Sequence, residues 1–456
     1  MAKRGTKGIT TMAAVVLAIV TLVAGLGIGL ATYPLAFPSP TAELEATISE
    51  LEATVSELQA TVSGLEAQLA AAKLTGPQRI GAILSMSGEL ATYGENEKAA
   101  AELAVSEVNA FLAEAGQGWY LELVVEDTET RPEICLEKVE SLAARGIKLL
   151  IGPLSSGELS NIMSYCNAEK ILAISQSSTA PALAADDFIF RYCPNDMWQG
   201  RAIARLMWES GIRYVVPTWR GDAWGDGLEE QGELRFEELG GSFSEERVRY
   251  SVPRADFSVE ASTLNDLVTD ALATHPADEV AVWGICFEEI GAYVDEARTY
   301  PNLAKVRWFG SDGSVNTPVL IDPAAPAISA FAVGTDFINP IFAPARTWKY
   351  EKVHDHVMEE FGREPDSYSY NIYDMVWAYA YSLMTTGKYD AEAIRTVFPD
   401  VVKSMYGAAG WVDFDVNGDR KPTDYNLWRV EEVEPGVYEW KLIGVWSLAT
   451  DTIIWL

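Results

Sequence analysis

Short apolar runs alternate with longer amphipathic segments from residue 80 onward. The runs are typical of strands buried on both faces of a parallel sheet, and the segments have the three- and four-residue spacing of helices. Strands are predicted at residues 80–84, 121–126, 147–151, 171–174, 188–192, 214–218, 279–283, 306–309 and 331–337. Helices are predicted at residues 95–114, 132–145, 156–170, 199–210, 226–239, 257–273 and 288–299. This alternation predicts an α/β fold with parallel sheets and right-handed crossovers.

The alternating pattern divides into two similar halves, one before residue 190 and one after residue 210. Two such halves in series predict two lobes with a cleft between them. After residue 330 the pattern is less regular, with helices expected at 347–361 and 370–384 and strands at 425–430 and 437–445. Such late additions fit a chain that crosses the hinge several times. The expected order is 78–194 in lobe 1, 195–335 in lobe 2, 336–412 in lobe 1 again, and 413–456 completing lobe 2.

The N-terminal part has a different pattern. Residues 1–8 are basic, and residues 9–32 form an uncharged apolar run. At ~1.5 Å per residue this run is long enough to cross the ~30 Å core of a bilayer. The flanking bases predict a cytoplasmic N-terminus and a globular domain outside the cell, tethered by this single anchor. The start also resembles an archaeal pilin-type signal, and cleavage after Gly8 would leave the apolar segment in place.

A proline-containing spacer at residues 33–40 precedes a heptad pattern at 41–74. Apolar residues alternate there at spacings of four and three. The a positions would be Ile48, Val55 and Val62, and the d positions Leu51, Leu58 and Leu65. A β-branched residue at a with leucine at d favours a parallel two-stranded coiled coil, so we expect a homo-oligomer through this segment. A trimer and a single amphipathic helix lying on the main domain are the alternatives.

Composition narrows the function. The formal charge of −32 argues against nucleic acid, whose phosphates the chain would repel. This acidity fits an extracellular domain or a salt-rich habitat. The four cysteines have no CxxC or metal-ligand spacing. A Cys135–Cys166 disulfide and unpaired buried thiols are both open interpretations.

Hydroxyl side chains follow two neighbouring strands of the first predicted sheet. Ser155 and Ser156 come after strand 147–151, with Ser156 as a helix N-cap, and Ser177, Ser178 and Thr179 come after strand 171–174. Parallel strands end at the same sheet edge, where open α/β sheets bind ligands and helix N-termini attract anions. We therefore expect a pocket for a small carboxylate, with simple helix capping as the alternative role.

Four further residues are expected at the cleft. Tyr93 lies in the predicted loop after the first strand, and Trp224, Phe287 and Asp312 follow strands of the second half. The aromatic residues would form apolar walls, and Asp312 would add one negative charge. The alternative roles are a surface tyrosine and an Asx turn at Asp312. An anion pocket facing a carboxylate suits a zwitterion, of which an α-amino acid is the simplest.

Catalytic and metal motifs are missing from the sequence. It has no GxSxG, P-loop or HExxH, and its three histidines form no ligand pair. The segment 413–424 is similar to a calcium loop, but its strand-like flanks and the lack of a glutamate at the twelfth place favour a polar hairpin. We therefore expect no enzyme activity, no cofactor and no metal.

A set of motifs resembles the type I periplasmic binding proteins of the leucine/isoleucine/valine family, which serve ABC transporters. These motifs are IGAILSMSGELATYG at 80–94, VVEDTETRPE at 124–133, IGPLSSGE at 151–158, SQSSTAPAL at 175–183, FRYCPNDMWQG at 190–200, DAWGDGL at 222–228, FGSDG at 309–313 and WVDFDVNGDR at 411–420. The resemblance implies two α/β lobes, joined by three hinge segments, that close on a small amino acid or related ligand and deliver it to ABC permease subunits. A sensor ectodomain is the alternative function.

The resemblance also assigns roles to the candidate residues. Ser156, Ser177 and Thr179 would hold a carboxylate, and Thr179 and Asp312 an ammonium. Tyr93 would close over the ligand from the first lobe. The chain departs from its family at the opposite wall. Trp224 stands where tyrosine is common, and Asp312 replaces a longer glutamate, so leucine does not follow as the ligand.

Overall fold

The computed structural model describes residues 41–71 and 74–456, which form two separate units. The predicted basic segment 1–8, apolar run 9–32 and spacer 33–40 lie outside the described residues. Within the part of the chain that the structure describes, no helix is long and apolar enough to span a membrane.

The first unit contains one long helix, α2 (Thr41–Ala71). Its predicted a residues, Ile48 and Val55 among them, are half-buried. The predicted d residues Leu51 and Leu58 are 44% and 47% exposed. The helix therefore carries an apolar seam with uncovered leucines, and its pairing with a second copy stays a prediction.

The second unit begins with a five-stranded parallel sheet in the order β2-β1-β3-β4-β5. Its strands are β1 (Gly76–Leu84), β2 (Trp119–Asp127), β3 (Leu149–Ile151), β4 (Leu172–Ser175) and β5 (Ile189–Arg191). The crossover helices are α3 (Ala91–Glu114), α4 (Pro132–Ala144) and α5 (Ser156–Glu169). Strands β3 and β4 are fully buried, as their uninterrupted apolar sequences predict.

A second sheet forms the other lobe, with the order β16-β15-β14-β11-β10-β9-β6-β7 and β8 paired to β6. Its strands are β6 (Tyr214–Arg220), β7 (Ser242–Phe243), β8 (Val248–Tyr250), β9 (Val280–Ile285), β10 (Arg307–Phe309), β11 (Ile338–Phe342), β14 (Tyr425–Glu434), β15 (Val437–Ser447) and β16 (Thr452–Trp455). Its helices are α6 (Asp196–Glu209), α7 (Ala223–Glu238), α8 (Ser258–Leu272), α9 (Ile290–Ala297) and α10 (Pro326–Gly334). The last three strands are antiparallel, so the parallel alternation ends at β11.

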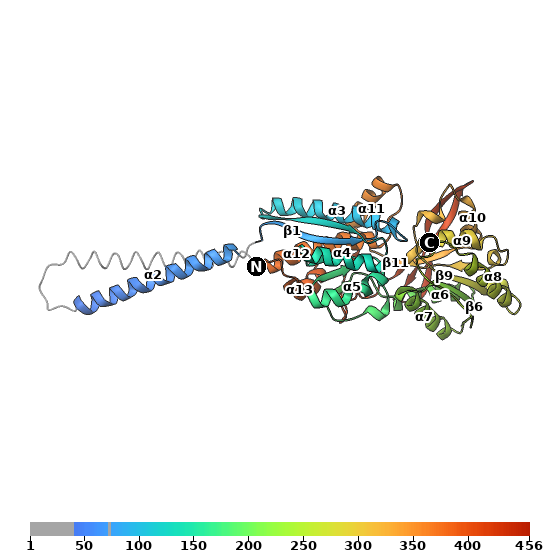
Figure 1. Ribbon diagram of the computed structural model, residues 1–456, viewed down its shortest axis with the longest axis horizontal. Helices are drawn as coiled ribbons and strands as arrows, with labels where there is room; N and C mark the ends of the chain where they lie inside the picture. Colours follow the sequence, from blue (N-terminus) through green and yellow to red (C-terminus); the bar gives the residue numbers. More distant parts are fainter. Residues whose placement is uncertain (1–40, 72–73) are drawn as a thin grey trace. The chain divides into compact units, whose positions relative to one another are not determined.

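Three late helices return to the first lobe: α11 (Trp348–Phe361), α12 (Tyr368–Thr386) and α13 (Ala391–Lys403). Figure 1 shows α12 and α13 lying with α3, α4 and α5, whereas α6 to α10 surround the second sheet. The Tyr379 hydroxyl on α12 bonds the carbonyl oxygens of Leu150 and Leu172, both at 2.9 Å. A tyrosine from the late helix α12 thus hydrogen-bonds to two adjacent strands of the first sheet, β3 and β4.

One predicted strand is wrong. Residues 331–337 were expected as the return strand, but most of them belong to α10, and β11 follows at Ile338. Phe331 and Ala332 are buried in this helix. An apolar run alone does not distinguish a buried helix from a buried strand.

The expected lobe boundaries also move. Strand β11 pairs with β10, so the chain leaves the second lobe after Phe342, beyond the expected 335/336 boundary. Phe414 packs on Phe190 at 5.2 Å, which keeps the segment after residue 413 with the first lobe. The chain returns to the second sheet with β14.

The calcium-like segment forms a polar turn whose acidic groups have protein partners. Asp419 makes a buried ion pair with Arg191, and Asp415 accepts hydrogen bonds from the backbone N–H groups of Asn417 and Asp419. No group of metal-ligating side chains is found among the described residues. All four cysteines are free and buried, so the Cys135–Cys166 disulfide does not form here.

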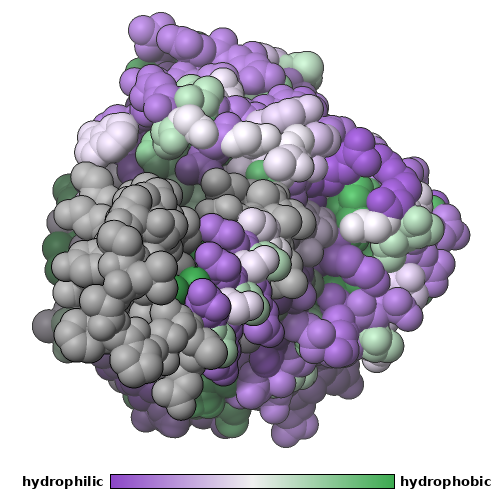
Figure 2. All heavy atoms as spheres, turned by 90° about the vertical axis from the view of Figure 1, so that its left-hand side faces the viewer, coloured by the Kyte–Doolittle hydropathy of each residue, from purple (hydrophilic) through white to green (hydrophobic). Residues whose placement is uncertain are grey.

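One face of the molecule shows how polar and apolar residues are distributed on its surface. On the face drawn in Figure 2, hydrophilic residues dominate among the coloured atoms and apolar ones appear as scattered patches. Isolated apolar residues are ordinary on a folded surface. The pocket at the carboxyl ends of the strands is therefore the feature that requires a functional explanation.

Candidate ligand site between the two lobes

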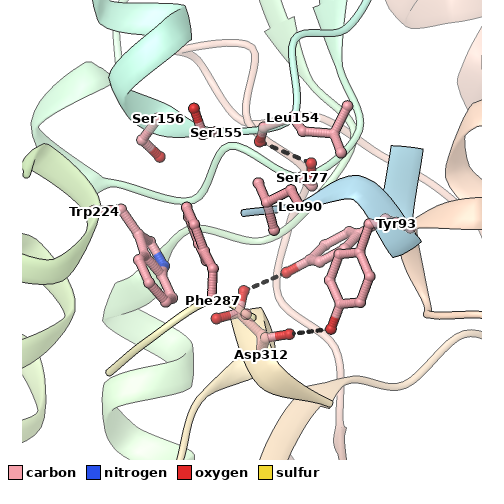
Figure 3. Close-up of a pocket in the computed structure, with 11 residues that line it drawn as sticks. Leu90, Tyr93, Leu154, Ser155, Ser156, Ser177, Trp224, Phe287 and Asp312 are labelled. Carbon is pink, nitrogen blue, oxygen red and sulfur yellow. Dashed lines mark hydrogen bonds between the residues drawn. The ribbon is translucent and has the colours of Figure 1, made fainter. Parts of the chain in front are cut away.

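A small pocket lies where the carboxyl ends of strands from both lobes face each other (Figure 3). Its lining residues are Leu90, Tyr93, Leu154, Ser155, Ser156, Ser177, Trp224, Phe287, Asp312, Gly313 and Tyr368. The enclosed space is about 20 Å³. A cavity of ~10–15 Å³ holds one water molecule, so this pocket has room for little more than that.

The serine side of the pocket is built on the first turn of α5. The N-cap is Ser155 rather than the predicted Ser156: the Glu158 N–H donates to Ser155 Oγ (3.2 Å), and the Ser155 N–H donates to Glu158 Oε2 (3.0 Å). This reciprocal capping box needs glutamate three residues after the serine, a signal that the sequence displays. Ser155 is therefore held in place by its own helix.

Ser156 ties the two hydroxyl-rich loops together. Its Oγ accepts hydrogen bonds from Ser178 Oγ (3.0 Å) and from the Ala180 N–H (3.1 Å). Ser177 also lines the pocket, and its hydroxyl donates to Leu154 O (2.8 Å). The structure thus brings Ser155, Ser156 and Ser177 to the pocket as expected.

Ser178 and Thr179 lie behind this wall. They are buried and do not line the pocket, although both were predicted as ligand contacts. Thr179 offers its carbonyl oxygen to the Asp196 N–H (2.9 Å). In this closed state the two residues support the loop rather than face the cavity.

Glu158 changes the electrostatics of the α5 N-terminus. Its carboxyl group is buried there, and burial raises its pKa while hydrogen bonds from Ser155, Thr128 and Ser85 oppose the rise. A carboxylate at this position satisfies part of the positive end of the helix. The chain itself thus occupies part of the expected anion site.

Tyr93 joins the two lobes. It was expected in a loop, but it lies in the first turn of α3. Its hydroxyl donates to the carbonyl oxygens of Asp312 (2.7 Å) and Val315 (2.6 Å) in the second lobe. Burial raises its pKa well above the usual range, so it stays neutral.

Asp312 lies opposite the serines, at the start of a short 3₁₀ turn after β10. Its Oδ2 accepts a hydrogen bond from the Tyr368 hydroxyl, and its backbone N–H donates to Gln199 Oε1 (2.9 Å). Among the described residues, none bonds to Oδ1, which is also buried. Burial is the main cause that raises the pKa of Asp312 to about 6.

The aromatic wall is a stacked pair. The rings of Trp224 and Phe287 lie 4.5 Å apart at an angle of 21°. A Cβ on Gly313 would lie 2.6 Å from the Phe287 ring and 2.8 Å from Trp224, so only glycine fits beside them. The predicted wall residues are therefore in contact, and a glycine at 313 lets Asp312 approach them.

Comparisons with known proteins identify the family of this chain. The family model described as periplasmic binding protein matches residues 77–432. The chain belongs to this family. It is a type I periplasmic binding protein of the leucine/isoleucine/valine group, which binds solutes and is not enzymatic.

Two relatives illustrate this membership of the periplasmic binding proteins. An uncharacterized protein of Methanocaldococcus jannaschii, MJ1266, is 32% identical over 83% of this chain and 91% of its own. Leu/Ile/Val-binding protein homolog 1 of Brucella suis is 23% identical over 79% of this chain and 92% of its own.

Solved structures of binding proteins share the fold. The leucine binding protein LivK of Thermotoga maritima has a TM-score of 0.65 and 21% identity, covering 82% of this chain and 98% of that one. A Rhodopseudomonas palustris solute binding protein in complex with benzoate has a TM-score of 0.64 and 14% identity, covering 80% and 95%. At these identities the likeness shows the fold alone.

Sequence reasoning missed four lining residues of this binding protein: Leu90, Leu154, Gly313 and Tyr368. Leu154 and Gly313 adjoin the predicted residues Ser155 and Asp312, and Leu90 lies three residues before Tyr93; all three were passed over because they carry no polar side chain. Tyr368 belongs to α12, more than fifty residues after Asp312. No local signal in its tyrosine-rich helix marks it as a cleft residue.

Proposed function

We propose that this protein is the extracellular solute-binding component of an ABC transporter. It captures a small amino acid, branched-chain or otherwise hydrophobic, or a related small acid or amide. The two lobes close on the ligand and present it to the permease subunits. No cofactor takes part.

The observation that carries this proposal is the buried Asp312 carboxyl, whose Oδ1 has no hydrogen-bond partner among the described residues. A buried carboxylate is costly without a partner, and an ammonium group would supply one. Across the pocket lie the α5 N-terminus and the Ser156 hydroxyl, which accepts two hydrogen bonds and keeps its own proton to donate to a carboxylate (Figure 3). One side of the pocket thus favours an ammonium group and the other a carboxylate, which together fit a zwitterion.

The size of the pocket indicates that the lobes must open before a ligand can enter. A space of about 20 Å³ is too small for any amino acid. The lobes therefore separate about the three connecting segments, admit the ligand and close again. The ligand stabilises the closed state through its contacts with both lobes.

The names of similar proteins support a small acid or amino acid. Relatives are named for leucine, isoleucine and valine, and one solved structure is the LivJ protein of Streptococcus pneumoniae in complex with isoleucine. Other similar structures contain benzoate or 4-hydroxybenzoate. Asp312 favours the amine-bearing class for this chain.

The tether belongs to the same proposal. The apolar run 9–32 would anchor the protein, and residues 41–74 would pair copies through Leu51 and Leu58. Leu58→Asp should convert residues 41–456 from an oligomer to a monomer, whereas Glu52→Gln on the same helix should not. Light scattering tests this, and a monomeric parent would rule out the coiled coil.

A sensor is the second candidate function. The substrate-binding protein BasB, named for a chemotactic signal transduction system in Halobacterium salinarum, is 29% identical over 29% of this chain. Disruption of neighbouring permease genes would abolish solute uptake for a transport component and leave it unchanged for a sensor.

The decisive experiment identifies the ligand. Native mass spectrometry gives the mass of the small molecule that co-purifies, and calorimetric titration then tests amino acids, aromatic acids and amides. We expect amino acids to bind. Binding of amides alone would contradict the amino-acid proposal.

A further inference from the structure

A second cluster of contacts crosses the cleft outside the pocket. Arg220, at the end of β6 in the second lobe, forms ion pairs with Asp222 (2.6 Å) and Glu289 (2.8 Å) of its own lobe. It forms a third ion pair with Glu89 (3.0 Å), which lies in the β1–α3 loop of the first lobe. The Arg220 side chain is only 4% exposed, so this pair is weakly screened by solvent.

Two hydrogen bonds donated by backbone N–H groups connect the lobes at the same place, and together they are called the backbone clasp. The Glu288 N–H of the second lobe donates to Glu89 O (3.1 Å). The Thr92 N–H of the first lobe donates to Glu288 Oε1 (2.9 Å). Hydrogen bonds therefore join residues 89–92 of the first lobe to Glu288 of the second, next to the ion pair between Arg220 and Glu89.

Arg220 also touches the wall of the pocket. Its guanidinium carbon lies 3.8 Å from the centre of the Phe287 ring, and the other face of Phe287 stacks on Trp224. A cation over an aromatic face is attractive and strongest when little water intervenes. The ion pair with Glu89 thus helps to hold the Arg220 guanidinium, and through it the Phe287 ring, in position.

We propose that Glu89 and Arg220 form a closure latch, with Arg220 as a positioning residue for the Phe287–Trp224 wall. When the lobes close, Glu89 reaches Arg220, the backbone clasp forms, and the guanidinium is held against Phe287. Closure and ordering of the pocket wall then occur together. The latch rests on the proposed function for its effect on affinity, but its effect on closure needs no ligand.

The geometry selects Glu89→Gln as the test variant. Its removal leaves Arg220 paired with Asp222 and Glu289, so no buried charge becomes unpaired. Glu288→Ala removes the acceptor for Thr92 and tests the other half of the clasp. Glu129→Gln is the matched control. Glu129 lines a second pocket of about 500 Å³ together with Glu89 and Arg220, yet it pairs with Arg131 of its own lobe.

Hydrogen exchange of the full chain in detergent micelles measures closure of the lobes. The backbone N–H groups of Thr92 and Glu288 donate hydrogen bonds across the cleft, so their exchange rates report how often the lobes open. We expect exchange at these amides to become about tenfold faster in Glu89→Gln and Glu288→Ala. Exchange in β1 and β9 should stay at the parent rate, as should both amides in Glu129→Gln. Parent-like exchange in Glu89→Gln would overturn the latch, and so would equal acceleration in the core strands.

Titration with L-leucine and L-isoleucine supplies a second measurement. If the parent binds, Glu89→Gln should dissociate the ligand about tenfold faster, and an unchanged dissociation rate would contradict the role of Arg220 at the wall. If the parent binds no amino acid, small acid or amide, the proposed function fails. The exchange experiment still decides the latch in that case.

Discussion

The Tyr93 hydroxyl in the first lobe lies 2.7 Å from the carbonyl oxygen of Asp312 in the second. Two residues that sequence reasoning assigned separately to the ligand thus bond each other across the closed cleft. Part of the energy of closure therefore comes from the protein itself.

Tyr93→Phe removes this bond and leaves the carbonyl groups of Asp312 and Val315 without their donor. A lost hydrogen bond costs about 1 kcal/mol, so ligand affinity should weaken about five- to tenfold. Calorimetric titration measures the change. Tyr120→Phe, at a tyrosine that is 48% exposed on β2, should leave affinity unaltered. Equal affinity of Tyr93→Phe and the parent would show that the bond makes no contribution.

Asp312→Asn keeps the shape of the side chain and removes its charge. Amine-bearing ligands should lose at least about thirtyfold in affinity, since a buried charge partner contributes about 2–5 kcal/mol. Plain acids should lose little or bind better. A titration panel of matched amino acids and acids checks this, with Asp295→Asn at an exposed site as control. Equal losses for both classes would contradict the role given to Asp312.

The pH dependence of binding follows from the same group. Burial raises the pKa of Asp312 to about 6, above its usual value of about 3.9. An ammonium ligand needs the ionised form, so below pH 6 binding must first release a proton. Affinity for amines should therefore rise about tenfold per pH unit up to pH 6 and level off above it. Asp312→Asn should flatten this profile, and a flat profile in the parent would contradict the assignment.

The contribution of Asp312 to folding stability depends on pH in the direction opposite to amine binding. A raised folded-state pKa means that the folded protein holds the proton more tightly than the unfolded chain, so the contribution of Asp312 is lost as pH rises through about 6. Asp374, whose pKa burial also raises to about 6, acts in the same direction. Stability and amine binding should thus move oppositely between pH 4 and 6, a contrast that thermal unfolding and titration measure together.

Gly313→Ala tests the packing of the wall. The added Cβ would meet Phe287 at 2.6 Å and the carbonyl oxygen of Cys286 at 2.8 Å. Overpacking of this kind costs about 1–3 kcal/mol, and displaced rings should also weaken binding. Gly334→Ala is the control, because nothing lies within 4 Å of its Cβ and it ends helix α10. Matching melting temperatures for the two variants would show that the wall yields easily.

Much of the fold was readable from local pattern. The uninterrupted apolar runs at β3 and β4 predicted strands buried on both faces, and the hydroxyl loops after them predicted a site at that sheet edge. The positions of Trp224, Phe287 and Asp312 after strands of the second half placed them at the cleft, and all three line the pocket. Each of these features depends on neighbours in sequence, or on the rule that parallel strands end together.

Features that depend on contacts between distant segments of the chain became visible only in the tertiary structure. Helix α10 replaced a predicted strand because its exposed positions, such as Ala327 and Ala330, are apolar like its buried ones, which hides helical periodicity. Tyr368 reached Asp312, and Tyr93 reached Val315, only because the closed lobes bring distant segments within hydrogen-bond distance. The buried environment of Asp312, and with it a pKa near 6, arises from the same closure. The sequence by itself therefore determined the class of fold and the kind of site, while packing between the lobes decided which groups meet and which carboxyl oxygen is left for a ligand.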